Sequence, residues 1–214
     1  MSGYGLYGGA GTGAVAVEAA LVLIGQAYEL VDLPDAAALA AASATNPMRQ
    51  VPALKFPDGG LMTESAAILT RLAELHPAAH LAPGPDHPAR GAFLRWMAFV
   101  SSAIYAFYWQ KDDPARLVRD RAQHARYNEA IEARITACWA TMDAQVTPGR
   151  YILGDTLSVL DLYVTVVSRF RPRRQSFYAY APKLGEVARR LDADPRLADL
   201  WAARYPFEAG WDRL

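Results

Sequence analysis

The chain has 214 residues, and its 22 Lys and Arg balance 22 Asp and Glu, so the formal net charge is zero at pH 7. This length is enough for one large domain or two small ones with a substantial core. The balanced charge argues against a partner made of nucleic acid, because such proteins normally need a strongly basic face.

Cysteine usage and the N-terminal composition limit the chemistry and the location. Cys138 is the single cysteine, so it forms no internal disulfide and cannot belong to a multi-cysteine metal site. Residues 1–48 contain no Lys or Arg, which removes the basic region of a signal peptide. The stretch AVAVEAALVLIG is too short to span a bilayer and is interrupted by Glu18. We therefore expect a cytoplasmic protein without a metal or a membrane segment.

Predicted strands and helices alternate through the first part of the chain. The apolar LYGG predicts a strand, and after the Gly-rich GGAGTG the stretch AVAVEAALVLIG predicts a helix that ends at Gly25. YELVDL predicts a second strand, and DAAALAAASA (35–44) predicts a second helix. PALKF and LMT, joined by PDGG, predict a hairpin, and SAAILTRLAELH predicts a helix that ends at Pro77. The predicted order is βαβαββα.

The second part of the chain is predicted to be helical almost throughout. A Pro-rich segment, PAAHLAPGPDHP, has no periodic apolar pattern and predicts a linker. The expected division is therefore a domain at 1–77, a linker at 78–88 and a helical domain at 89–214. Cys138 lies on an apolar helical stripe, which favours a buried core thiol over a nucleophile. Ser158 and Asp161, three residues apart in LSVLDLYVTVVSRF, predict a capping box at a helix start.

The stretch NPMRQVPALKFPDGGLMTES, residues 46–65, predicts a site for a short peptide. A proline before a strand can be cis, and Val51 before Pro52 would then offer its backbone groups to an extended ligand. Glu64 and Ser65 open the next helix, where free amides and a hydroxyl suit a carboxylate and Glu64 can accept from an ammonium group. The alternatives are a trans proline at a sheet edge and a Ser65 that only caps its helix.

These features together resemble the glutathione S-transferase superfamily. The βαβαββα order, VPAL, TES at a helix start and SVLD in an all-helical second half contribute to a resemblance over the full length. The resemblance implies a thioredoxin-like N-terminal domain that holds glutathione as co-substrate. It also implies an all-helical C-terminal domain that forms much of the second-substrate pocket, and a homodimer.

The resemblance also implies contacts for the central stretch. Val51 would bind the cysteinyl backbone of glutathione, with Pro52 cis, and the γ-glutamyl end would lie at the start of the helix that follows LMT. The implied glutathione contacts are Arg49, Gln50, Val51, Pro52, Glu64 and Ser65.

The resemblance leaves open which group stabilises the thiolate of glutathione. A free thiol is mostly protonated at neutral pH. Family members use a Tyr, Ser or Cys at the end of the first strand or in the next loop, and the loop here, GGAGTGA, has no Ser or Cys. The catalytic candidates are Thr12, which we favour because the glycines allow close approach to a ligand, and Tyr7 at the strand end. The alternatives are a capping Thr12, a partly buried Tyr7, or stabilisation by loop amides alone.

An aromatic cluster, IYAFYW, predicts an apolar wall for the second substrate through Tyr105, Tyr108 and Trp109. The run RFRPRRQ predicts a solvated cationic face, with contact to an anionic substrate as the alternative. The leading hypothesis is a transferase that conjugates or isomerises small electrophiles with glutathione. The rival is a glutathione-binding or protein-interaction protein with little activity. A redox protein acting through its own cysteine is disfavoured.

Overall fold

The computed structural model describes residues 3–32, 46–48, 50–170 and 173–205, and it begins with a four-stranded sheet. The strand order is β2-β1-β3-β4, with β1 parallel to β2 and the pairs β1–β3 and β3–β4 antiparallel. The strands are β1 (Tyr4–Gly8), β2 (Tyr28–Asp32), β3 (Ala53–Lys55) and β4 (Leu61–Thr63). All four predicted strands are confirmed, whereas the helix predicted at 35–44 lies outside the described residues.

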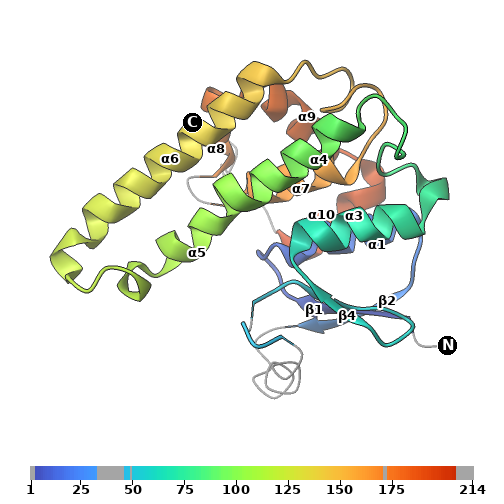
Figure 1. Ribbon diagram of the computed structural model, residues 1–214, viewed down its shortest axis with the longest axis horizontal. Coiled ribbons are helices and arrows are strands. Elements are labelled where there is room, and N and C mark those ends of the chain that lie inside the picture. The colour runs from blue at the N-terminus through green and yellow to red at the C-terminus, as the bar shows by residue number, and fades with distance from the viewer. Residues whose placement is uncertain (1–2, 33–45, 49, 171–172, 206–214) are drawn as a thin grey trace.

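Two helices cover one face of this sheet (Figure 1). They are α1 (Ala14–Ile24) and α3 (Ser65–Leu75), which pack against each other, and α1 also packs against α7 from the second part of the chain. Gly25 ends α1 with φ 75°, a left-handed conformation that glycine adopts without the penalty of a β-carbon. The predicted end of this helix is therefore confirmed.

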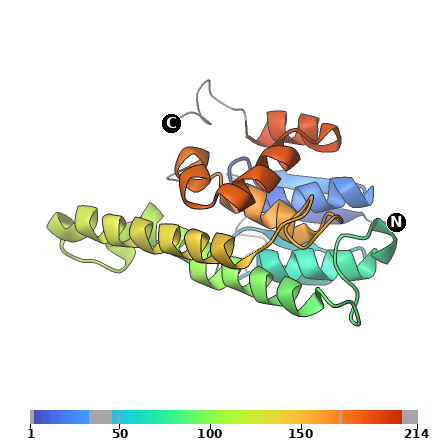
Figure 2. The same cartoon turned by 90° about the horizontal axis from the view of Figure 1, so that it is seen from above.

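The rest of the described chain is mostly helical, as predicted. A first long helix runs through α4, a π-helical turn and α5, and lies beside α6, so that the pair extends outward from one side of the molecule (Figures 1 and 2). The helices are α4 (Arg90–Phe99), the π-helical turn Val100–Tyr105, α5 (Ala106–Asp112), α6 (His124–Gln145), α7 (Val159–Val167), α8 (Arg174–Tyr180), α9 (Pro182–Asp192) and α10 (Ala198–Arg204). Short 3-10 turns span Pro77–Ala79, Pro114–Arg116, Arg121–Gln123 and Pro195–Leu197. Across the described ranges, none of the helices has both the length and the hydrophobicity needed to cross a bilayer.

Helix α7 forms the centre of the helical core and starts at the predicted capping box. The backbone N–H and the hydroxyl of Ser158 both donate to Asp161 Oδ2 at 2.8 Å, and the Ile152 N–H donates to Asp161 Oδ1 at 2.8 Å. The Asp161 side chain is fully buried, and this burial raises its pKa to about 6 against the opposing effect of the three donors. The carboxylate therefore joins the loop before α7 to the start of that helix.

Cys138 lies in the helical core, which confirms the prediction. It lies on the buried stripe of α6 next to Trp139, and burial raises the pKa of its thiol. A buried thiol with a raised pKa is a poor nucleophile at neutral pH.

A buried ion pair joins α1 to α10. Glu18 interrupts the apolar sequence of α1 and is nearly inaccessible to solvent. Its carboxylate accepts from Arg204, with Nε–Oε2 at 2.9 Å and Nη2–Oε1 at 3.1 Å, and from the Tyr28 hydroxyl at 2.8 Å. These contacts hold the last described helix against the sheet.

Candidate active site

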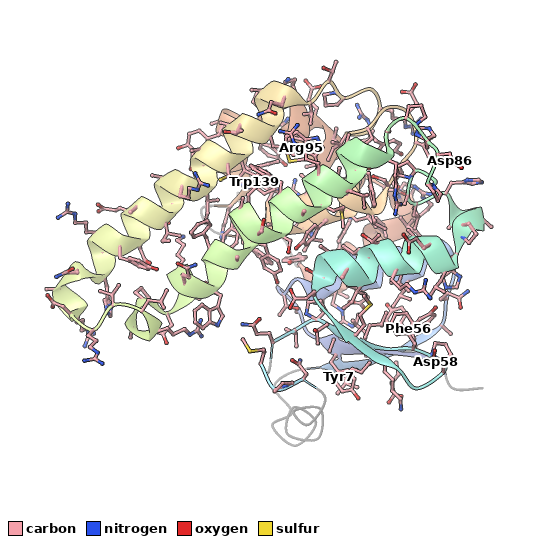
Figure 3. The ribbon with its side chains drawn as sticks, in the orientation of Figure 1. Tyr7, Phe56, Asp58, Asp86, Arg95 and Trp139 are labelled. Atoms are coloured by element: carbon pink, nitrogen blue, oxygen red, sulfur yellow. The ribbon has the colours of Figure 1, made fainter. Side chains whose placement is uncertain are left out.

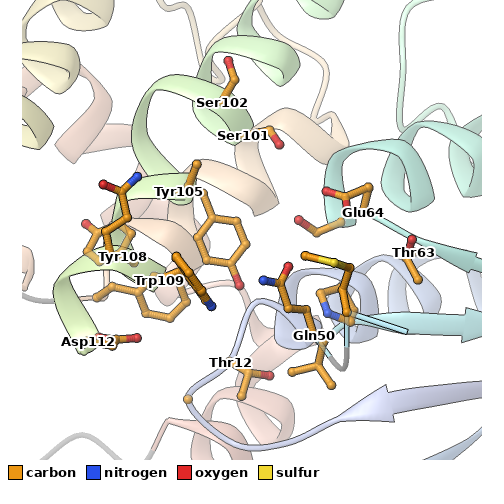
Figure 4. A pocket seen from close by; sticks show the side chains of 18 of the residues that line it. Thr12, Gln50, Thr63, Glu64, Ser101, Ser102, Tyr105, Tyr108, Trp109 and Asp112 are labelled. Carbon is orange, nitrogen blue, oxygen red and sulfur yellow. The ribbon is translucent and has the colours of Figure 1, made fainter. Parts of the chain in front are cut away.

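A large cavity, of about 1300 Å³, lies between the sheet and the helical part of the chain. Its walls come from the β1–α1 loop, the segment before β3, the junction of β4 and α3, the π-helical turn with α5, and the end of α7 (Figure 4). Segments that are far apart in sequence therefore meet around one space that is large enough for a peptide and a second small molecule.

The segment before β3 forms the side of the cavity next to the sheet. The Val51–Pro52 peptide is cis, as predicted, and Gln50, Val51 and Pro52 all line the cavity. The amide nitrogen of Asn46 donates to the Gln50 carbonyl oxygen at 2.6 Å, which fixes the turn into this segment. Arg49 lies outside the described residues, so its predicted contact stays a prediction.

The junction of β4 and α3 places Glu64 and Ser65 at the edge of the cavity. Glu64 has φ 68° and ψ 101°, a conformation that a residue with a β-carbon rarely adopts and that is often found at binding sites. Ser65 is the first residue of α3 and is buried, and its hydroxyl donates to the Tyr163 hydroxyl of α7 at 3.0 Å. The amides at the start of α3 can receive a negatively charged group.

Thr12 lines the cavity, but its hydroxyl already takes part in local hydrogen bonds. Thr12 Oγ1 donates to the Gly9 carbonyl oxygen at 2.8 Å and accepts from the Ala14 N–H at 3.3 Å. The Tyr205 hydroxyl donates to the Thr12 carbonyl oxygen at 3.2 Å. The Thr12 side chain therefore joins the loop to the first residue of α1, and its predicted catalytic role stays a prediction.

Tyr7 is not among the residues that line the cavity. It pairs with Val31 and Ala53 inside the sheet, and side chains on a strand alternate between faces. Because Leu6 is fully buried toward the helices, Tyr7 points to the opposite face of the sheet (Figure 3). The position at the strand end thus did not bring this tyrosine to the site.

Tyr105, Tyr108 and Trp109 all line the cavity on the helical side (Figure 4). Tyr105 stacks on Phe170 with ring centroids 5.5 Å apart, and Tyr108 meets the same ring edge-on at 5.2 Å. Burial raises the pKa of both tyrosines, so both remain protonated at neutral pH. Trp109 is 43% exposed at the mouth of the cavity.

Two arginines of the run after α7, Arg169 and Arg174, are buried, which corrects the predicted solvated face at these two positions. Arg173 is exposed and lines the cavity, and Arg171 lies outside the described residues. Arg174 is fully buried and donates to the Asp192 carboxylate at 2.8 Å and to the Thr165 carbonyl oxygen at 2.8 Å. Arg169 is also buried and pairs with Asp192, while its guanidinium lies 4.3 Å from the Trp201 ring centroid. The helical part therefore buries these two charges against Asp192, which lies about twenty residues further along the chain.

Several lining residues were not predicted from the sequence. They come from the π-helical turn, the end of α7 and the segment after α10, and they include Ser101, Ser102, Phe170 and Tyr205. Their positions depend on how the helices pack, and no local pattern in the sequence marks them.

A thioredoxin-like sheet, a helical second part and a cavity with a cis-proline wall define the class of protein. Residues 14–82 match the family model described as the glutathione S-transferase N-terminal domain. The uncharacterized GST-like protein YncG of Escherichia coli is 26% identical over 199 residues, with 91% of this chain and 95% of that protein covered. The maleylacetoacetate isomerase of Rattus norvegicus is 33% identical over 118 residues, or 55% of this chain and 51% of the isomerase.

A solved structure gives the same classification. The glutathione transferase homolog from Sulfitobacter, crystallised with bound glutathione, superposes with a TM-score of 0.81 at 25% identity, covering 94% of this chain and 97% of that one. The family match over residues 14–82, the GST-like relative and the shared fold all support the glutathione S-transferase superfamily.

Proposed function

We propose that this protein is a glutathione transferase that binds glutathione in the cavity and adds its sulfur to a small electrophile. The proposal rests on one observation. The cis-proline segment, the start of α3, the loop before α1 and a wall of aromatic side chains all line the same cavity. A relative of similar length, the Sulfitobacter homolog, was crystallised with glutathione.

In this proposal glutathione lies along the edge of the sheet as an extended peptide. Its cysteinyl backbone pairs with Val51, and its γ-glutamyl carboxylate meets Ser65 and the free amides at the start of α3. Glu64 accepts from the γ-glutamyl ammonium group, and Gln50 and Arg49 flank the ligand. The sulfur then points toward the start of α1.

The chemical step requires a thiolate. The glutathione S–H releases its proton to solvent, and lowering the thiol pKa by about two units takes about 2.7 kcal/mol of preferential stabilisation. The sulfur electron pair then forms a C–S bond while a leaving group departs with the displaced pair. For isomerisation, the same addition is followed by elimination that restores the thiolate, the chemistry suggested by the name of the rat relative. Tyr105, Tyr108 and Trp109 favour a second substrate with an aromatic or apolar body.

The second candidate function is glutathione binding without efficient catalysis. It is favoured by the positions of the two predicted sulfur partners, because the Thr12 hydroxyl donates within its loop and Tyr7 is not among the residues that line the cavity. Turnover of several generic electrophiles separates the two functions, since a binding protein would take up glutathione without forming conjugates.

Calorimetry tests the proposed function by comparing the glutathione affinity of the wild-type protein with that of Ser65→Ala. Loss of a hydrogen bond to a charged group is expected to cost about 1.5 to 3 kcal/mol, so affinity should fall by about 10- to 150-fold. Tyr163→Phe is the matched control, because it removes the protein partner of Ser65 and keeps the serine hydroxyl. Affinity unchanged by Ser65→Ala would contradict the proposed site.

The proposal includes a homodimer in the cytoplasm, with a domain boundary at 78–88 between 1–77 and 89–214. Exposed apolar side chains, such as Met48 and Leu94, supply surface that an interface can bury. Light scattering at micromolar concentration is expected to give twice the mass of the chain, and a monomer mass would refute the dimer.

A further inference from the structure

The start of α1 faces a hydroxyl group that comes from the helical part of the chain. The Tyr105 hydroxyl lies directly against Gly13, since a β-carbon added to Gly13 would come within 2.1 Å of Tyr105 Oη. The Gly13 backbone lies close enough to oppose the effect of burial, which raises the pKa of Tyr105. In Figure 4 the Tyr105 ring stands in the middle of the cavity wall with its hydroxyl directed toward the loop that carries Thr12.

The backbone of the long first helix holds this tyrosine in place. Tyr105 ends the π-helical turn Val100–Tyr105, and such a turn rotates the following side chains relative to a regular α-helix. Its ring is stacked on Phe170 and is met edge-on by Tyr163 at 6.1 Å between centroids. The hydroxyl therefore occupies a fixed position beside the first turn of α1.

The Tyr105 hydroxyl is able to donate a hydrogen bond to a ligand. Burial raises the pKa of Tyr105, so the O–H remains intact at neutral pH. Within the described part of the chain, no residue accepts a hydrogen bond from Tyr105, whereas the Thr12 hydroxyl donates to Gly9. Of these two hydroxyls at the start of α1, Tyr105 is the one whose hydrogen is available to a ligand.

We propose that Tyr105 donates the hydrogen bond that stabilises the glutathione thiolate, a role that neither Thr12 nor Tyr7 fulfils. The proposal rests on the proposed function, because it takes glutathione as the ligand. When glutathione binds, its S–H gives its proton to solvent, and the sulfur keeps the electron pair and accepts from Tyr105 Oη and from the amides at the start of α1. The Tyr105 O–H bond stays unbroken throughout.

The test is Tyr105→Phe, which removes the hydroxyl and keeps the ring stacked on Phe170. The measurement is the thiolate absorbance of the glutathione complex against pH, with calorimetry of glutathione binding in parallel. We expect the pKa of the bound thiol to rise by about one to two pH units. The conjugation rate below that pKa should fall by about 10-fold or more, while the dissociation constant changes by less than about threefold.

Tyr127→Phe is the matched control, since it removes a tyrosine hydroxyl of the helical part that donates to Gln110. It should leave the thiol pKa at the wild-type value. Thr12→Val should also leave it nearly unchanged. A second variant, Gly13→Ala, keeps the tyrosine and forces its hydroxyl away from α1, so it should raise the thiol pKa as Tyr105→Phe does.

The outcomes separate the two proposals. If wild type binds no glutathione, the proposed function fails. If wild type binds glutathione as a thiolate and both Tyr105→Phe and Gly13→Ala leave the thiol pKa unchanged, the role of Tyr105 is refuted alone. A rise of the pKa in Thr12→Val without a rise in Tyr105→Phe would transfer the role to Thr12.

Discussion

Asp161→Ala is expected to lower the free energy of unfolding by about 3 to 5 kcal/mol. The substitution leaves the backbone N–H groups of Ile152 and Ser158 buried without their acceptor, and each such group costs about 1 to 3 kcal/mol. It also leaves a small void at the centre of the helical core. For a chain of this size the melting temperature should fall on the order of 10 °C. Urea denaturation followed by circular dichroism measures the change.

Asp155→Ala provides the control for this prediction. Asp155 also accepts from a backbone amide, that of Arg150 at 3.1 Å, but it is exposed to solvent. Water can replace the lost acceptor there, so the expected change is under about 1 kcal/mol. Equal effects of the two substitutions would show that the buried carboxylate has no special role in the helical core.

Arg204→Met is expected to cost about 3 to 5 kcal/mol of unfolding free energy, because it leaves the buried Glu18 carboxylate without its guanidinium partner. The Glu18 side chain is only 4% exposed, so water cannot take over the two hydrogen bonds. The double substitution Glu18→Leu with Arg204→Met removes both charges and should recover most of the lost stability. Thermal denaturation of these two variants and of the single variant Glu18→Leu gives the coupling energy.

Arg196→Met is the matched control for Arg204→Met. Arg196 pairs with Asp194 at 2.6 Å, but its side chain is largely exposed, and exposed pairs contribute about 0 to 1 kcal/mol. If Arg204→Met lowers the free energy of unfolding as little as Arg196→Met does, the ion pair does not hold α10 against the sheet.

The elements of the fold follow from local patterns in the sequence. Gly25 marks the end of α1, Pro-Asp-Gly-Gly marks the hairpin, and Ser158 with Asp161 marks the start of α7, because each of these signals depends on neighbouring residues only. The partners of Glu18 and Asp192 lie far away in the sequence, and only the packed helices bring Arg204 and Arg174 to them. The sequence therefore predicted neither the burial of Glu18 and Arg174 nor the partners of these charges.

The binding half of the site was easier to predict than the catalytic half. Val51, Pro52, Glu64 and Ser65 belong to one continuous stretch, so their spacing alone predicts that they meet at one side of the cavity. Tyr105 is about ninety residues from Gly13, and its position depends on a π-helical turn that leaves no clear sequence signal. An apolar wall was predicted for it, and its contact with α1 could be seen only in three dimensions.

The most direct measurement is a crystal structure of the protein grown with saturating glutathione. The γ-glutamyl carboxylate is expected at Ser65 and the start of α3, the cysteinyl backbone along Val51, and the sulfur within hydrogen-bond distance of Tyr105 Oη. An empty cavity at saturating glutathione, or a peptide bound elsewhere, would contradict glutathione binding at this site. Glutathione bound as expected with its sulfur turned away from both Tyr105 and the start of α1 would contradict the proposed activation of the thiol.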